Sequence, residues 1–115
     1  MLYDVIVIGG GASGMMAAIT AAQQNKVVLL LEAADRIGRK LLATGNGRCN
    51  FTNTNQDLSH YHSESLLNMA IALKQFNCQD TVKFFKDLGI FSKNRNGYLY
   101  PHSDAASAVL EVLRM

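Results

Sequence analysis

The sequence is poor in cysteine, which excludes two common ways of stabilising a small protein. Its 115 residues include two cysteines, one proline and no tryptophan. Cys49 and Cys78 form neither a CxxC motif nor the spacing of a zinc site, so reduced thiols fit better than a disulfide framework. His60, His62 and His102 also lack ligand spacing on a shared helix face. We therefore expect no metal site.

Long apolar runs are also missing. The longest run, Val27 to Leu31, is far shorter than the roughly 18 residues that a membrane-spanning helix needs. Asp4 interrupts the first apolar stretch, and the start of the chain lacks the basic region of a signal peptide. These absences predict a cytoplasmic protein with no membrane partner.

Neither sign of charge dominates the sequence. The formal net charge is +2, and 17% of the residues are charged against 49% that are hydrophobic. This is the composition of a folded globular domain, and the length is that of a single domain. Basic residues are dispersed apart from the segment Arg36 to Lys40. We therefore expect no nucleic-acid partner.

The first third of the chain has the pattern of one βαβ unit. Tyr3 to Ile8 is apolar on both alternating faces, which predicts a strand buried in a parallel sheet. Helix-forming residues follow from Ala12 to Gln24, Asn25 is suited to a left-handed cap, and Val27 to Leu31 is a second apolar strand. The unit therefore covers residues 3–32, and its crossover should be right-handed.

A glycine-rich turn, "GGGASG", joins the first strand to the helix. Gly9, Gly11 and Gly14 occupy the three glycine positions of GxGxxG. Gly9 allows a tight turn, Gly11 lets a pyrophosphate approach the backbone, and Gly14 allows close packing of helix on strand. The hexapeptide alone fits a flexible turn equally well, and its context of strand, helix and second strand favours a phosphate site.

Glu32 ends the second strand. A carboxylate at this point can accept both hydroxyls of an adenosine ribose and would repel a 2′-phosphate. The unit therefore predicts FAD or NAD at this site and disfavours NADP. A solvated acid at the end of a strand is the alternative.

The rest of the chain shows weaker patterns. We expect a short helix over residues 38–43, a polar loop from Thr44 to Asn55 and a helix from about Ser63 to Gln75. Asn77 should cap a second helix that ends at Gly89. The final segments are two strands flanking an Asn96-Gly97 turn, over residues 90–93 and 98–100, and a helix over residues 104–114 capped by Ser103.

The last predicted helix reaches Met115 without a capping signal. Two parallel strands and a hairpin do not make a doubly covered sheet. We therefore expect an α/β, Rossmann-like FAD/NAD(P)-binding domain of which residues 1–115 form the N-terminal portion, with further strands of a doubly wound sheet beyond residue 115. The domain would comprise the unit 3–32, a flavin-side loop 35–55, and the helices and hairpin of 63–115.

Three segments of the sequence resemble the BaiN/RdsA, or YhiN-like, family of NAD(P)/FAD-dependent oxidoreductases, also called aminoacetone oxidase family FAD-binding enzymes. They are "VIVIGGGASGMMAAITAA", "LLLEAADRIGRKLLATGNGRCNFTN" and "GYLYPHSDAASAVLEVL". The resemblance implies a bacterial flavoprotein of roughly 400 residues, within the size range of a multi-domain chain. It also implies FAD as cofactor and NAD(P)H as electron donor.

The resemblance assigns roles to thirteen residues. It implies that the FAD pyrophosphate is lined by Gly9, Gly11, Ala12 and Ser13, with support from Gly14, and that the ribose is held by Glu32. It places Arg39 and Lys40 by the ribose or phosphates. The residues that it brings toward the flavin are Asn46, Gly47, Arg48, Cys49 and Asn50. Solvated charge is the alternative for Arg39 and Lys40.

Several other side chains have simpler interpretations. We interpret Cys49 as a small buried residue rather than a redox thiol, because it has no nearby partner cysteine. Cys78 should lie in the core, and Phe84 and Phe85 should pack rather than bind a cofactor.

The leading hypothesis is thus a flavin-dependent oxidoreductase that is reduced by NAD(P)H. An NAD-dependent dehydrogenase is one alternative, and an FAD-binding protein that modifies RNA or senses nucleotides is another. The sequence names neither a substrate nor a catalytic acid or base, and it leaves the oligomeric state open.

Overall fold

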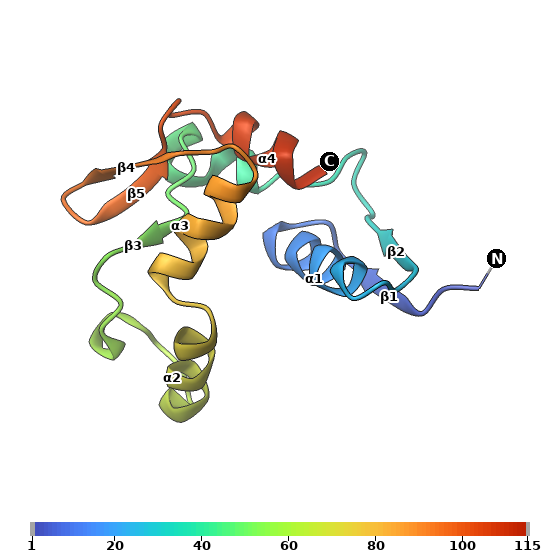
Figure 1. Cartoon of the computed structure of the whole chain (residues 1–115), viewed down its shortest axis with the longest axis horizontal. Coiled ribbons are helices and arrows are strands. Elements are labelled where there is room, and N and C mark those ends of the chain that lie inside the picture. The colour runs from blue at the N-terminus through green and yellow to red at the C-terminus, as the bar shows by residue number, and fades with distance from the viewer. Residues whose placement is uncertain (1, 115) are drawn as a thin grey trace.

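The computed structural model describes residues 2–114. Figure 1 shows a β1–α1–β2 unit at one end of the molecule and the β4–β5 hairpin at the other, with helix α4 between them. Strands β1 (Val5–Ile8) and β2 (Val28–Leu31) pair in parallel, with Val5 opposite Val28. Helix α1 (Ala12–Gln23) connects them and packs on both. The predicted βαβ unit is confirmed.

The burial of the first strand differs from the prediction. Ile6 is 58% exposed and Ile8 is 86% exposed, although the apolar pattern predicts burial on both faces. The reason is that α1 covers one side of the strands, whereas the parallel sheet contains only β1 and β2 within residues 2–114. One face of the sheet therefore remains apolar and uncovered in this part of the chain.

A second, antiparallel sheet has the strand order β3-β5-β4. Strand β4 (Ser92–Arg95) begins two residues later than predicted, and β5 (Tyr98–Pro101) pairs with it in a hairpin. The turn residues Asn96 and Gly97 have φ angles of 55° and 93°, as a two-residue type I′ turn requires. The predicted turn is confirmed.

The segment predicted as an irregular loop contains regular structure at both ends. A 3-10 segment, η1 (Leu41–Gly47), replaces the short helix predicted over residues 38–43 and is broken at Thr44, Gly45 and Asn46. Strand β3 (Thr52–Asn53) pairs with β5. Sequence patterns did not predict β3 because a two-residue strand has no measurable periodicity and forms only against its partner.

Two helices follow the short 3-10 segment η2 (Leu58–His60). Helix α2 (Leu66–Gln75) begins later than predicted, at a cap formed by Ser65. Helix α3 (Cys78–Asp87) has the capping box expected from Asn77: the Asn77 Oδ1 accepts from the Asp80 N–H, and the Asp80 carboxylate accepts from the Asn77 N–H, each at 2.9 Å.

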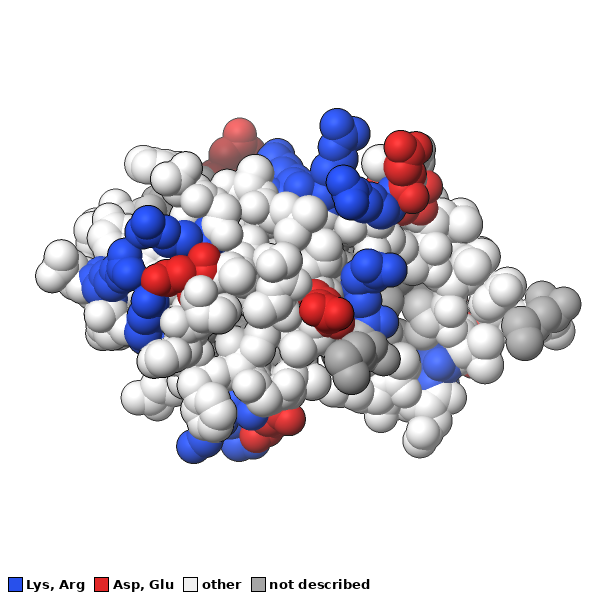
Figure 2. Space-filling model, turned by 90° about the horizontal axis from the view of Figure 1, so that it is seen from above, with Lys and Arg blue, Asp and Glu red and all other residues white. Residues whose placement is uncertain are grey.

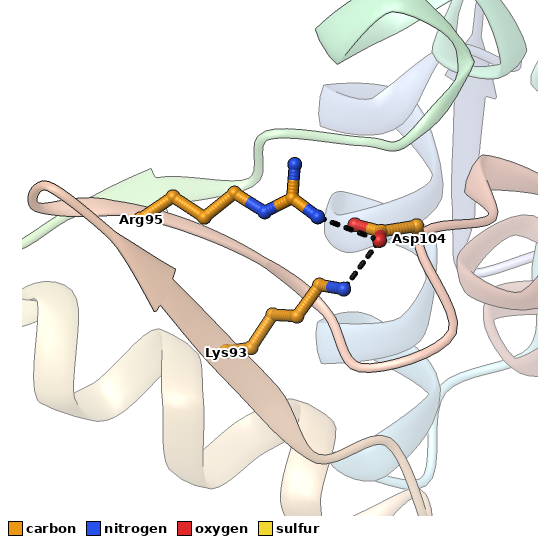
Figure 3. Close-up of polar contacts among 3 residues, drawn as sticks. All are labelled: Lys93, Arg95 and Asp104. Carbon is orange, nitrogen blue, oxygen red and sulfur yellow. Dashed lines mark hydrogen bonds and ion pairs between the residues drawn. The ribbon is translucent and has the colours of Figure 1, made fainter.

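Helix α4 (Ala106–Arg114) begins two residues later than predicted, so Ser103 does not directly precede it and the predicted Ser103 cap is wrong. Asp104 intervenes in a left-handed conformation, with φ of 56°, and its carboxylate accepts hydrogen bonds from Lys93 and Arg95 of β4 (Figure 3). The Asp104 side chain is therefore held by β4 and lies outside the first turn of α4. No helix among residues 2–114 is both long and apolar enough to cross a membrane.

The hydrophobic core lies where α1, η1, α3 and α4 meet. Helix α4 supplies four of its members because its apolar side chains recur at helical spacing toward α1 and η1. The buried core side chains are Met15, Leu41, Cys49, Phe85, Ile90, Ala106, Val109, Leu110 and Leu113. This core holds the start of α1 against the segment that follows β2.

Candidate functional site

Two glycines shape the turn between β1 and α1. Gly9 has a φ angle of +104°, a conformation that side chains rarely adopt. A Cβ atom on Gly14 would lie 1.8 Å from the carbonyl oxygen of Gly9, so only glycine allows α1 to pack this closely on the end of β1. These are the steric reasons predicted for the first and third glycines of the motif.

The middle glycine faces open space. A Cβ atom on Gly11 would meet nothing within 4 Å, and Gly11 precedes α1 without any side-chain cap or acidic residue in the first turn. The first N–H groups of a helix have no intrahelical acceptors and carry the positive end of its dipole. The start of α1 can therefore take an anionic group.

Glu32 is bound to the backbone of the glycine turn. Its Oε1 accepts from the Gly10 N–H at 2.9 Å and its Oε2 accepts from the Ala34 N–H at 2.8 Å. The bond from Ala34 and then that from Gly10 lower the pKa of Glu32 below its usual value. In this structure the ionised carboxylate thus joins the glycine turn to the segment after β2, a role that the sequence did not reveal.

A second contact ties the same two segments together. The Gly38 N–H donates to the carbonyl oxygen of Gly10 at 2.6 Å. A Cβ atom on Gly10 would lie 2.6 Å from Ile37 Cγ2, and one on Gly38 would lie 2.1 Å from Leu110 Cδ1. Gly10 and Gly38 therefore permit a close approach that the motif does not describe. In the sequence, the glycine of "DRIGRK" was the feature that could have predicted this contact.

A cavity of about 620 Å³ opens beside the start of α1. Its lining includes Gly11, Ala12 and Ser13 of the glycine turn and Lys40, Cys49 and Asn50 of the segment after β2. Four aromatic side chains also line it: Phe51, Phe76, Phe84 and Phe85. The fold thus brings the glycine turn together with the predicted flavin-side segment.

The other predicted site residues lie outside this cavity. Gly9, Gly14 and Glu32 shape the glycine turn but do not line the cavity. Arg39, Asn46, Gly47 and Arg48 are exposed and do not line the cavity. Asn46 and Gly47 have φ angles of 56° and 84°, so the loop turns sharply at the point predicted to approach the flavin.

The Cys49 thiol is 4% exposed, and burial raises its pKa. A protonated, enclosed thiol is a poor nucleophile, which supports its interpretation as a small buried residue. Cys78 differs from the prediction, because it is only partly buried at the first position of α3, where its N–H donates to the Gln56 Oε1 at 2.8 Å. Both cysteines are free.

Asn50 and Phe51 fasten the cavity wall to β5. With its nitrogen facing them, the Asn50 side-chain amide donates to the carbonyl oxygens of Thr52 and Leu99 at 3.0 and 3.1 Å. The Phe51 ring meets the Phe85 ring edge-on with centroids 4.9 Å apart, and Phe84 meets Phe85 in the same way at 5.2 Å. Phe84 and Phe85 pack as predicted, and they also line the cavity, which the sequence did not predict.

The parallel β1–α1–β2 start and its partial sheet define an α/β domain of the Rossmann type that binds FAD. The chain belongs to the family described as HI0933-like protein Rossmann domain, whose model matches residues 3–115. This family of flavin oxidoreductases is the one that the three sequence segments resemble.

Two relatives show how much of a family member the chain represents. It is 52% identical over 86 residues to a 3-dehydro-bile acid delta(4,6)-reductase of Clostridium scindens, covering 75% of this chain and 21% of the relative. It is 32% identical over 80 residues to a ribosomal RNA dihydrouridine synthase of Haemophilus influenzae, covering 69% and 20%. The chain therefore matches about a fifth of the length of each relative.

Proposed function

We propose that the full-length protein is a flavin-dependent oxidoreductase that holds the pyrophosphate of FAD at the start of α1. The cavity carries this proposal, because it joins Gly11, Ala12 and Ser13 to Lys40, Cys49 and Asn50 in one space. Its volume of about 620 Å³ is in the range of cofactor and ligand pockets, roughly 300–1,000 Å³. Family membership supports the choice of FAD.

The chain's own residues would bind and orient the cofactor. The backbone N–H groups at Ala12 and Ser13 would donate to phosphate oxygens, and the ammonium group of Lys40, which lines the cavity, would offset their charge. Gly9 and Gly14 maintain the turn. When bound, FAD supplies hydride and electron transfer, while the protein supplies position and electrostatics.

Glu32 can hold a ribose while it holds the turn. An ionised carboxylate has about four acceptor positions, and the Gly10 and Ala34 N–H groups use one on each oxygen. The remaining positions can accept hydrogen bonds from two ribose hydroxyls. The negative charge disfavours a 2′-phosphate at the same place. Arg39, Asn46, Gly47 and Arg48 stay predictions for ribose and flavin contacts.

We further propose that the reaction adds hydrogen to an organic substrate with NAD(P)H as donor. One relative is named a reductase and the other a dihydrouridine synthase, and both names denote hydrogen addition. A role in RNA modification is the second candidate, favoured by the name of the Haemophilus influenzae relative.

The visible spectrum of the purified full-length protein tests the cofactor. We expect flavin bands, and bleaching of those bands by NADH or NADPH will identify the donor. A protein that shows no flavin bands even after addition of FAD would contradict the proposal. Retention of NAD in place of flavin would support an NAD-dependent dehydrogenase.

Gly11→Leu tests the pyrophosphate site. A leucine side chain would enter the open space beside the first N–H groups of α1, so we expect the variant to lose FAD while it still folds. Ala17→Leu, an exposed position on the same helix, is the matched control and should retain FAD. Normal FAD content in Gly11→Leu would show that the phosphates lie elsewhere.

A further inference from the structure

A second cavity lies away from the glycine turn. It has a volume of about 440 Å³ and is bordered by segment 53–61 and the hairpin turn. None of its lining residues lines the first cavity. They are three amides, one imidazole and two phenols: Asn53, Asn55, His60, Asn96, Tyr61 and Tyr98. Asn55 bonds to His60 and to the Asp57 N–H, and Asn53 Oδ1 accepts from the Asn55 N–H. The amide nitrogen of Asn53, the amide of Asn96 and the tyrosine hydroxyls leave donors and acceptors beside flat aromatic surfaces.

This cavity continues onto the outer face of the β3-β5-β4 sheet. Tyr98 pairs with Asn53 on one side and with Arg95 on the other, and directly opposite residues point to the same face of a sheet. The next residue of β5, Leu99, points to the other face and is 6% exposed, whereas Tyr98 is 50% exposed. Tyr98 and Arg95 therefore face away from the core.

Positive charge is in excess beside this face. Lys93 and Arg95 both donate to the same carboxylate oxygen of Asp104 (Figure 3), and Arg48 is near enough to lower the pKa of Asp104 further. Two cations thus pair with one carboxylate. Figure 2 shows Lys and Arg side chains gathered around an acidic one at one end of the molecule.

The Arg95 guanidinium is also held in place over an aromatic ring. Its central carbon lies 5.8 Å from the centroid of the Tyr100 ring, a cation–π distance. Its side chain is nevertheless 46% exposed. An arginine that is positioned but accessible can bind a phosphate with paired N–H donors.

We propose that this cavity and the adjoining sheet face form a second nucleotide site, which takes a nucleoside phosphate. The base would stack on Tyr98 with its edge toward the amides of Asn53 and Asn96, and the phosphate would lie toward Arg95 and Lys93. Aromatic stacking, amide donors and acceptors, and cations are the combination that recognises a base and its phosphate.

Two sources carry this chemistry: a nicotinamide dinucleotide and a nucleotide within an RNA strand. We favour the dinucleotide, because the proposed function requires a donor of hydride besides the FAD at the first cavity. This choice of source rests on the proposed function, whereas the site itself rests on the second cavity and the sheet face.

Binding to the full-length protein tests the site. The probes are NADPH, NADH, 5′-AMP and a short single-stranded RNA, and their dissociation constants are measured by calorimetry alongside the FAD content. Loss of one base stack is worth about 1–3 kcal/mol, so Tyr98→Ala should weaken binding by about 5- to 150-fold. Phe91→Ala, an aromatic residue that is 61% exposed and lines neither cavity, is the matched control and should bind normally.

Two charge variants separate ligand binding from a structural role. Arg95→Ala should weaken binding and flatten its salt dependence. Asp104→Asn should strengthen binding, because it frees Lys93 and Arg95 while asparagine still tolerates the left-handed backbone. A structural role alone predicts that both variants weaken binding. Lys83→Ala, on the exposed side of α3, controls for net charge.

Each outcome is decisive. If Tyr98→Ala and Arg95→Ala weaken the binding of NADPH or NADH, and 5′-AMP competes with that binding, the site is supported and its ligand is a dinucleotide. If the two variants weaken the binding of RNA alone, the site is supported and its ligand is an RNA strand. Unchanged binding of every probe in both variants, or weaker binding in Asp104→Asn, overturns the proposal. The FAD content tests the proposed function separately, since these variants leave the first cavity intact.

Discussion

At the scale of the residue, Glu32 has one task that the structure shows and one that we propose. Its position at the end of β2 predicted a ribose ligand, and the structure shows that its carboxylate also holds the glycine turn through Gly10 and Ala34. Both tasks require the ionised form, because only a carboxylate has enough acceptor positions for the backbone and for two ribose hydroxyls. The acid therefore organises the turn before any cofactor is bound.

Glu32→Gln should remove a pH-dependent part of the protein's stability. The folded-state pKa of Glu32 lies below its ordinary value of 4.5, so its contribution is present above pH 4.5 and is lost as the pH falls through the lowered pKa. We expect the Tm of the full-length protein to exceed that of the variant near neutral pH, and the two values to converge in acid.

Thermal unfolding of both proteins from about pH 7 down to about pH 3 measures this difference. The variant should also retain less FAD, because an amide nitrogen cannot accept a hydrogen bond from a ribose hydroxyl. A difference in Tm that stays constant through the acid range would show that the backbone bonds of Glu32 do not stabilise the fold.

At the scale of the element, short-range chemistry determines some boundaries and tertiary contacts determine others. Asn77 starts α3 through a capping box, and Asn96-Gly97 forms the hairpin turn. Both depend on residues within a few positions and were predictable. By contrast, α4 begins at Ala106 rather than at residue 104, and the Asp104 carboxylate accepts from Lys93 and Arg95 of β4.

Asn77→Ala should destabilise the full-length protein by about 1 kcal/mol, the usual effect of losing an N-cap side chain. The variant leaves the Asp80 N–H without its acceptor at the start of a helix that carries Phe84 and Phe85 of the cavity wall. Denaturant unfolding measures the change in the free energy of unfolding.

Ser65→Ala provides the comparison for this variant. The Ser65 hydroxyl accepts from the Asn68 N–H at the longer distance of 3.3 Å, and α2 has no buried residue. We expect a smaller loss of stability from Ser65→Ala. An equal loss in the two variants would show that the capping box stabilises α3 no more than the single Ser65 bond stabilises α2.

At the scale of the whole molecule, the described residues present two distinct halves. The β1–α1–β2 end carries the glycine turn, and the β3-β5-β4 sheet at the other end (Figure 1) carries amides, tyrosines and cations. Residues of the start of α1 and of the segment that leads into β3 line the first cavity. The apolar outer side of β1, exposed here at Ile6 and Ile8, indicates a surface that a complete Rossmann sheet would cover.

FAD should stabilise the full-length protein by mass action. A ligand that binds only the folded state adds about 2.7 kcal/mol when its free concentration is 100 times its Kd. We expect the Tm of the protein stripped of flavin to rise steadily as FAD is added. The Gly11→Leu variant should show no such rise, and an equal rise in both proteins would place FAD away from the glycine turn.

The sequence by itself determined the βαβ unit, the glycine turn, the α3 cap and the hairpin turn, because each depends on local periodicity, a required φ angle or a neighbouring side chain. It also identified the glycine turn and the segment from Arg39 to Asn50 as candidates for one site.

Only the tertiary structure decided which of those residues share a cavity, that Phe51, Phe76, Phe84 and Phe85 face it, and that Glu32 binds the glycine turn. It also decided the existence of β3 and the start of α4. These features depend on contacts between residues far apart in the sequence, whose energies appear only once the core has brought the elements together.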